Sequence, residues 1–458
     1  MNAFQSLTIA ALVVLTPGMV VSGEENAPAR ESVPRYQLEV GQQLVYEALW
    51  QYASTNEKYG TTDHTTYWVT RTNQDGSWHI VGRNEDQFFN GDAAHMDTSG
   101  NPARAAFDAF ELFPDGRVTE KFDEVQSSDL IDLFVAIPAD HAAMKTGWTV
   151  ETSPVRKATY RLAPESDPAS GRWIFEKTDR GIFSEVYPSN SRFLVYFDAR
   201  RGLITRTESQ SRYEDKGASG RGVTELKSTT MKDRAWAAEL AQETDVFLQA
   251  RTAMRDAEKS VQGGVSVDDA LAAARRALSD GRARVKLPEL QKEFDALRSR
   301  LDDSARYLAQ DQQEETEVVN KAAADWETTD LDGNKHSLTD YRGKVVVLDF
   351  WYRGCGWCIR AMPQIKEVVD HFHDQPVAVL GMNIDKKEKD ARFVIDKLKL
   401  NYPTLKAEGI PDKYRVHGYP ALIIIDQKGI VRARHLGYTP DLREEITKTI
   451  DGLLAKAN

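Results

Sequence analysis

Cysteine is nearly absent from this chain. Its 458 residues include two cysteines, Cys355 and Cys358, which are separated only by Gly356 and Trp357. One such pair excludes the network of structural disulfides that holds small secreted domains together. Two thiols this close in sequence suit a disulfide that opens and closes, so we interpret the pair as a chemical site.

Basic residues are outnumbered. The chain has 59 Lys and Arg against 70 Asp and Glu, a formal net charge of −11 and a pI near 5.5. This balance argues against nucleic acid or an anionic membrane surface as a partner.

Long hydrophobic runs are also missing. The N-terminal run from Leu7 to Leu15 is well short of the roughly 20 residues that a membrane span needs. Small residues follow it up to Gly23, and the chain then becomes acidic. This order predicts a signal peptide over residues 1–23, although no Lys or Arg precedes the run. We expect a periplasmic or secreted protein with no stable membrane span after cleavage; an uncleaved anchor is the alternative.

Residues 36–231 have the period of two that is typical of strands. Tyr46, Ala48, Trp50 and Tyr52 share one face, and further apolar runs are joined by turns such as Asn73 to Gly76. We predict an antiparallel β-rich domain, a meander or open barrel of unknown role. We interpret its aromatics as core and cross-strand pairs rather than as the lining of a ligand site.

Residues 232–318 change to a helical period. They predict a helical connector that is interrupted at Gly263 and Gly264, with Ser266 and Asp269 resembling a capping box. The polar stretch from Gln310 to Glu317 is predicted to be a helix end or a short linker. We favour a helical hairpin or spacer over a dimerising coiled coil, because the heptads are not sustained.

Residues 319–458 alternate strands and helices. We expect a hairpin from Trp326 to Leu338 and then a mixed sheet covered by helices, giving an α/β domain. The expected strands are 345–351, 377–384, 421–426 and 430–435, and the expected helices are 358–372, 390–398 and 442–454. The cysteine pair falls between the first of these strands and the first of these helices. A helix N-terminus favours a thiolate over a thiol, which suits Cys355 to act as a nucleophile.

The motifs of this last segment resemble the thioredoxin fold. They are Leu348 to Cys358, then Pro363, then Tyr419-Pro420 before an apolar strand ending at Asp426. The stretch from Asp330 to Lys344 resembles, more specifically, the TlpA/ResA-type periplasmic thiol-disulfide oxidoreductases. The resemblance covers roughly residues 322–456, and nothing upstream is recognised.

The resemblance implies roles for single residues. Cys355, as the more exposed sulfur, is expected to attack a disulfide, and Cys358 to resolve the mixed disulfide. Asp349 matches the buried acid that exchanges a proton with the second thiol. Pro420 matches the cis-proline that faces the disulfide, and Tyr419 would offer backbone groups to an extended substrate strand.

This sequence departs from thioredoxin in three places. Gly354 and Trp357 stand where tryptophan and proline are common, and Trp357 is expected either to pack over the sulfurs or to extend toward a partner. Gly381 stands where thioredoxin has a lysine near the acid. Without that cation, burial should raise the pKa of Asp349. The alternative is a strand-end carboxylate with local hydrogen bonds.

A metal site is the weaker interpretation of the remaining reactive residues. His371 and His373 are two apart near a helix end, where side chains diverge, so we interpret them as solvated. His417 precedes Tyr419 and either flanks the sulfurs or is an ordinary loop residue. A copper or zinc site on the two cysteines and a histidine stays an alternative. We expect no cofactor and no metal.

Two functions from different classes fit the sequence. The first is an exported thiol-disulfide oxidoreductase, a reductase that exchanges disulfides with protein clients and an upstream electron donor. The second is a scaffold protein whose β-rich domain binds a ligand or partner, with an accessory redox module. We prefer the first, because no other residues form a chemical site.

Overall fold

The computed structural model describes residues 33–456 except for 93–95, 97, 99–103, 120–127, 132, 154–155, 182–185, 187–189, 214–216 and 263–264. The predicted signal peptide and the break at Gly263 and Gly264 therefore lie outside the described residues. Within the described part of the chain, no helix combines the length and the apolar character that crossing a bilayer requires.

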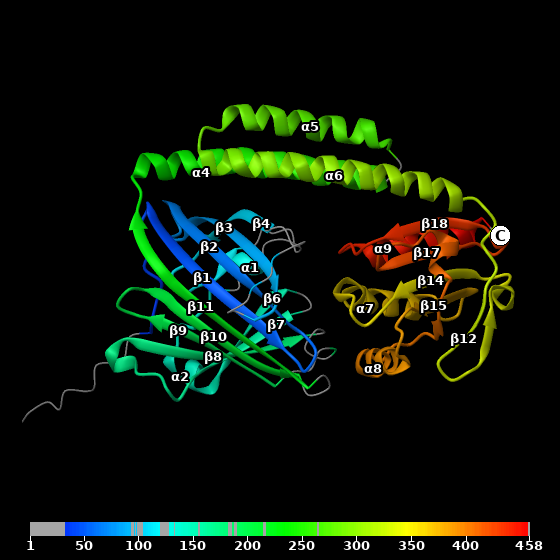
Figure 1. The fold of residues 1–458 in the computed structure, drawn as a ribbon, viewed down its shortest axis with the longest axis horizontal. Helices are drawn as coiled ribbons and strands as arrows, with labels where there is room; N and C mark the ends of the chain where they lie inside the picture. Colours follow the sequence, from blue (N-terminus) through cyan, green and yellow to red (C-terminus); the bar gives the residue numbers. More distant parts are fainter. Residues whose placement is uncertain are drawn as a thin grey trace, which may run out of the picture. The chain divides into compact units, whose positions relative to one another are not determined.

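The N-terminal domain is one eleven-stranded sheet in which every strand pairs antiparallel to its neighbours (Figure 1). Its order, β5-β4-β3-β2-β1-β11-β10-β9-β8-β7-β6, joins two meanders through the pairing of the first strand with the last. The strands are β1 (Gln42–Ala53), β2 (Lys58–Thr72), β3 (Trp78–Asn90), β4 (Arg104–Leu112), β5 (Val118–Thr119), β6 (Trp148–Ser153), β7 (Arg156–Leu162), β8 (Arg172–Gly181), β9 (Asn190–Asp198), β10 (Leu203–Tyr213) and β11 (Ala218–Met231). The predicted antiparallel domain is confirmed.

Aromatic side chains fill the core on one face of this sheet. Tyr46 and Tyr67 meet edge to face there, and the hydroxyl of Tyr67 donates to the carbonyl of Leu130 in the short helix α1 (Ser128–Ile131). A second short helix, α2 (His141–Thr146), adds Met144 to the same core. These aromatics are core residues, as predicted from the period-two pattern.

Three helices form the connector and pack against one another: α4 (Arg234–Gln262), α5 (Val267–Arg284) and α6 (Pro288–Val318). The side chain of Ser266 caps α5 by accepting the N–H of Asp269, as the sequence predicts. The apolar faces of the helices also cover Trp68, Val81 and Phe107 of the sheet. The connector is therefore part of a continuous core with the β-rich domain.

Of the two alternatives predicted for Gln310 to Glu317, the helix end is confirmed: this stretch forms the last two turns of α6, which Figure 1 shows as one long helix. Its polar side chains have partners in the C-terminal domain: Asp311 and Glu314 pair with Arg434. The sequence pattern could not predict this packing against the C-terminal domain, because a helix that packs through ion pairs has no apolar stripe.

The C-terminal domain has a five-stranded mixed sheet in the order β16-β15-β14-β17-β18. The elements from β12 onward are β12 (Glu327–Thr329), β13 (Lys335–Ser337), β14 (Val345–Trp351), α7 (Gly356–His371), β15 (Val377–Asn383), α8 (Glu388–Leu398), β16 (Thr404–Lys406), β17 (Ala421–Ile425), β18 (Val431–Leu436) and α9 (Leu442–Ala455). β14 runs parallel to β15 and antiparallel to β17. The expected order of strands and helices is confirmed, and the short strand β16 is an addition.

Strand β14 is buried along its whole length because the domain has a core on each face of the sheet. Val346, Leu348 and Phe350 point to one core, whereas Val345 and Val347 point to the other. A strand buried on both faces needs a continuous apolar run. The acidic side chain of Asp349 is therefore an exception with a cost, and it calls for a chemical explanation.

Two helix glycines give a matched test of the packing. A Cβ at Gly281 in α5 would lie 2.7 Å from the buried ring of Phe294, whereas one at Gly452 in α9 would meet nothing within 4 Å. We expect Gly281→Ala to destabilise the protein by about 1 to 3 kcal/mol through overpacking. Gly452→Ala should stabilise it by up to about 1 kcal/mol through helix propensity. Urea unfolding measures both; a stabilising Gly281→Ala would contradict the tight packing of α5 against α6.

Candidate active site

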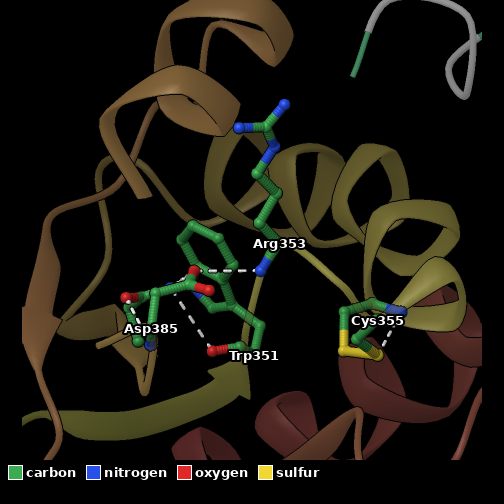
Figure 2. The surroundings of a disulfide bond; sticks show 6 residues. Trp351, Arg353, Cys355 and Asp385 are labelled. Carbon is green, nitrogen blue, oxygen red and sulfur yellow. Dashed lines mark hydrogen bonds between the residues drawn. A yellow bond between two sulfur atoms is a disulfide. The ribbon is translucent and has the colours of Figure 1, made fainter. Parts of the chain in front are cut away.

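The cysteine pair lies where buried strand β14 ends and helix α7 begins. Cys355 is the N-cap residue of α7, and its sulfur accepts the backbone N–H of Cys358 at 3.0 Å. The two sulfurs form a disulfide, with Cα atoms 5.2 Å apart (Figure 2). An N-terminal helix turn offers unpaired N–H groups, so a thiolate released at Cys355 on reduction would be stabilised.

The loop before Cys355 is anchored by a polar network, drawn in Figure 2. The backbone N–H of Arg353 donates to the Oδ2 of Asp385 at 2.9 Å, and the Nδ2 of Asn383 donates to the same oxygen at 2.8 Å. The guanidinium of Arg353 points away from the disulfide and pairs with Asp390 at 2.9 Å. These contacts fix the approach of the chain to the first cysteine.

Both cysteines are buried: Cys355 is 6% exposed and Cys358 is 1% exposed. The order agrees with the prediction that Cys355 is the more exposed, but its exposure is small. Trp351 and Met362 pack in the same cluster, which also includes Val186, from the segment between β8 and β9. A large partner thus reaches Cys355 only over a small surface.

Asp349 lies on β14, 1% exposed, beneath the helices that cover this face of the sheet. Burial raises the pKa of its carboxyl group to about 7, and the one opposing cause is the hydroxyl of Tyr402, which donates to Oδ2 at 3.0 Å. Burial and the neighbouring carboxylate also raise the pKa of Tyr402 well above its ordinary value. Asp349 therefore has both a local hydrogen bond and a raised pKa. The sequence offered these two features as alternatives, and the structure combines them.

Gly381 leaves the space in which Tyr402, rather than a lysine, becomes the partner of Asp349. Gly381 pairs with Asp349 across β14 and β15. A Cβ on Gly381 would lie 3.0 Å from the indole nitrogen of Trp351 and 3.2 Å from the Tyr402 ring. Any larger residue at 381 would push these side chains away, so the glycine makes room for the hydrogen bond between Tyr402 and Asp349.

The predicted substrate-binding residues surround the cluster of cysteines. The peptide bond between Tyr419 and Pro420 is cis, and the Tyr419 ring packs against the cluster and meets Tyr352 edge to face at 5.5 Å. Trp357 also packs against the cluster and stacks on Tyr438, with ring centroids 5.6 Å apart. The ring of Trp357 thus lies between Tyr438 and the apolar cluster that includes both cysteines.

The histidines show no arrangement for a metal among the described residues, where no three His, Cys, Asp or Glu side chains are grouped as a metal ion requires. His373 contacts Asp374, and the exposed His417 lies 3.7 Å from Glu314 of α6. His417 thus faces the connector helix.

Sequence reasoning missed Tyr402, Arg353 and Asp385. Tyr402 is 53 residues from Asp349, and nothing in the local pattern marks it as a partner of the acid. Arg353 was visible in the motif, but its anchoring role depends on Asp385 after β15. A signal for Asp385 did exist, since a polar residue directly after a buried strand often carries function.

A buried cysteine pair at the start of a helix, next to a mixed sheet, defines a thioredoxin-like redox site. A sequence profile of the AhpC/TSA family matches residues 319–434. The thioredoxin-like protein YneN of Bacillus subtilis is 35% identical over 119 residues, covering 25% of this chain and 69% of that protein. The thiol-disulfide oxidoreductase ResA of Geobacillus thermodenitrificans is 33% identical over 117 residues, covering 25% and 67%.

A solved structure of a thiol:disulfide interchange protein DsbE from Chlorobium tepidum is 28% identical, with a TM-score of 0.29 over 30% of this chain and 97% of that one. Through its C-terminal domain, the chain belongs to the AhpC/TSA family and resembles the ResA oxidoreductases within it. With its redox cysteine pair, the protein is a thiol-disulfide oxidoreductase.

The raised pKa of Asp349 predicts a pH-dependent stability. Between pH 4 and 7 the folded protein keeps a proton that the unfolded chain releases, so rising pH weakens the fold through this group. We expect Asp349→Asn, which can still accept from Tyr402, to be more stable than the wild type at pH 8 by about 2 to 4 kcal/mol. At pH 4 the difference should shrink toward zero. Urea unfolding at both pH values measures it; an equal difference at both would contradict the raised pKa.

Proposed function

We propose that the protein is an exported reductase that transfers electrons from its cysteine pair to disulfides in protein clients. The observation that carries this proposal is the position of Cys355, the N-cap of α7, with its sulfur facing the N–H of Cys358. A thiolate is the attacking form in disulfide exchange, and a position at a helix N-terminus stabilises it.

The reaction takes two exchanges. In the reduced enzyme, the thiolate of Cys355 attacks one sulfur of the client disulfide; a mixed disulfide forms, and the other client sulfur leaves as a thiolate. The thiolate of Cys358 then attacks the sulfur of Cys355, which closes the enzyme disulfide and releases the second client sulfur. Two electrons pass to the client, and an upstream dithiol donor must reduce the enzyme again.

Asp349 is proposed to take the proton of Cys358 before the second exchange. With a pKa of about 7, its carboxyl group is divided between its charged and neutral forms near neutrality and can both accept and return a proton. The Tyr402 hydroxyl supports the charged form through its hydrogen bond, and a lysine near the acid would lower its pKa further.

Tyr419, Pro420 and Trp357 are proposed to bind the client. Tyr419 and Trp357 contact the cysteine cluster from different elements, the segment before β17 and the first turn of α7. An extended client segment would pair with the backbone at Tyr419 and rest on the aromatic surface beside the disulfide.

The division of labour follows from the domain limits, which we propose as 1–23 for the signal peptide, 36–231, 232–318 and 319–458. Export places the enzyme in the periplasm or outside the cell, where client disulfides persist. The β-rich domain and helical connector position the redox module or supply client preference.

A trapping experiment tests the proposal. Cys358→Ser leaves the first exchange intact but removes the resolving thiol, so it should accumulate mixed disulfides with client proteins on Cys355. These should appear on non-reducing gels and disappear with reductant. Cys355→Ser is the matched control and should form none. The wild type should reduce insulin disulfides, with activity falling by at least about a hundredfold in either variant.

Turnover of insulin by Cys355→Ser would overturn the assignment of the nucleophile. If the wild type turned over no disulfide at all and Cys358→Ser trapped nothing, the scaffold interpretation would replace the reductase.

A further inference from the structure

The end of helix α6 lies against the four residues that lead to the cis-proline, residues 415–418, which we call the pre-proline segment. The side chain of Arg434 on β18 is 1% exposed and joins the two. Its guanidinium pairs with Asp311, pairs with Glu314 at 3.1 Å, and donates to the backbone carbonyl of Arg415. One buried cation thus binds two carboxylates of the helix and the backbone of the pre-proline segment.

Two further contacts join the pre-proline segment to the same helix, and the side chain of Tyr307 lies near Gly418. The side chain of Arg415 pairs with Glu317 at 3.0 Å, and His417 lies 3.7 Å from Glu314. The Tyr307 hydroxyl would lie 3.7 Å from a Cβ on Gly418. Arg415 and His417 therefore contact α6, and the helix supports the loop that carries Tyr419.

This supporting helix is not part of the thioredoxin-like domain. The family match begins at residue 319, after α6 has ended at Val318. The first half of α6 is buried elsewhere: Leu290 and Phe294 pack in the core shared with the β-rich domain, and Glu293 pairs with Arg83 of β3 at 2.8 Å. The pre-proline segment is thus supported by a helix that is fixed at its other end in the upstream domains.

We propose that Asp311, Glu314 and Arg434 are positioning residues that hold the Tyr419 backbone in place for the client; this rests on the proposed function. A buried guanidinium needs its partners, because an unpaired charge in a protein interior is strongly unfavourable. While both carboxylates are charged, Arg434 stays in place and keeps its hydrogen bond to Arg415. Without them it must move to water and release the pre-proline segment.

The test compares full-length variants of nearly unchanged shape. Asp311→Asn with Glu314→Gln removes the two carboxylates that form ion pairs with Arg434, whereas Glu317→Gln removes an exposed partner of Arg415 and is the matched control. Two measurements apply: hydrogen exchange of the amides around residues 415–421, and the kinetics of insulin reduction. Reaction of reduced Cys355 with iodoacetamide checks that the sulfur itself is unaffected.

In the double variant we expect exchange around residues 415–421 to rise at least about tenfold, while β14 and α7 keep their protection. The KM for insulin should rise about tenfold with kcat changed less than about twofold, because substrate placement and not sulfur chemistry is affected. The iodoacetamide rate and the Glu317→Gln variant should stay within about twofold of the wild type. If the double variant does not fold, Glu314→Gln alone should show smaller changes in the same direction.

Unchanged exchange in the double variant would overturn the proposal, and so would raised exchange with an unchanged KM. A wild type without any insulin turnover would instead refute the proposed function, and the exchange measurement would still decide whether these residues hold the segment.

Discussion

The chemistry of this protein depends on one junction, where a strand buried on both faces leads through a short loop into the first turn of a helix. β14 is fixed by apolar contacts on each side, so Cys355 is placed by the core of the domain. The anchor from Arg353 to Asp385 fixes the short loop between them. The reactive sulfur therefore lies at the helix N-terminus, and the rest of the site is built around that position.

The pKa of Asp349 depends on a neutral hydrogen-bond partner and on a glycine at the position where thioredoxin has a lysine. Asp349 is buried, its hydrogen-bond partner Tyr402 is neutral, and Gly381 leaves room for that partner. The carboxyl group consequently sits near the midpoint of its titration at neutral pH. The buried charge of Arg434, in contrast, is neutralised by ion pairs with two carboxylates of α6. The neutral partner of Asp349 lets its carboxyl group exchange a proton, as a reactive group must. The ion pairs of Arg434 keep its charge fixed, as a positioning group requires.

Much of this architecture could be predicted from sequence because it follows local rules. The apolar run of β14, the helix after Cys358 and the hairpins of the β-rich domain each follow from a short pattern of residues. What failed depends on contacts between distant segments. Tyr402 has no pattern that points to Asp349, and the polar end of α6 leaves both a helix end and a linker open because its partner Arg434 is distant in sequence. The small exposure of Cys355 also escaped prediction, since it depends on Trp351, Met362 and Val186 packing together.

The proposed reaction requires that the sulfur of Cys355 is ionised and reactive at the start of α7. The Cys358→Ser variant has a single cysteine, so its rate of alkylation by iodoacetamide at different pH values reports on Cys355 alone. We expect the rate to reach half its maximum well below pH 8.5, which is about the midpoint of an ordinary cysteine. A half-maximum at or above that pH would contradict it.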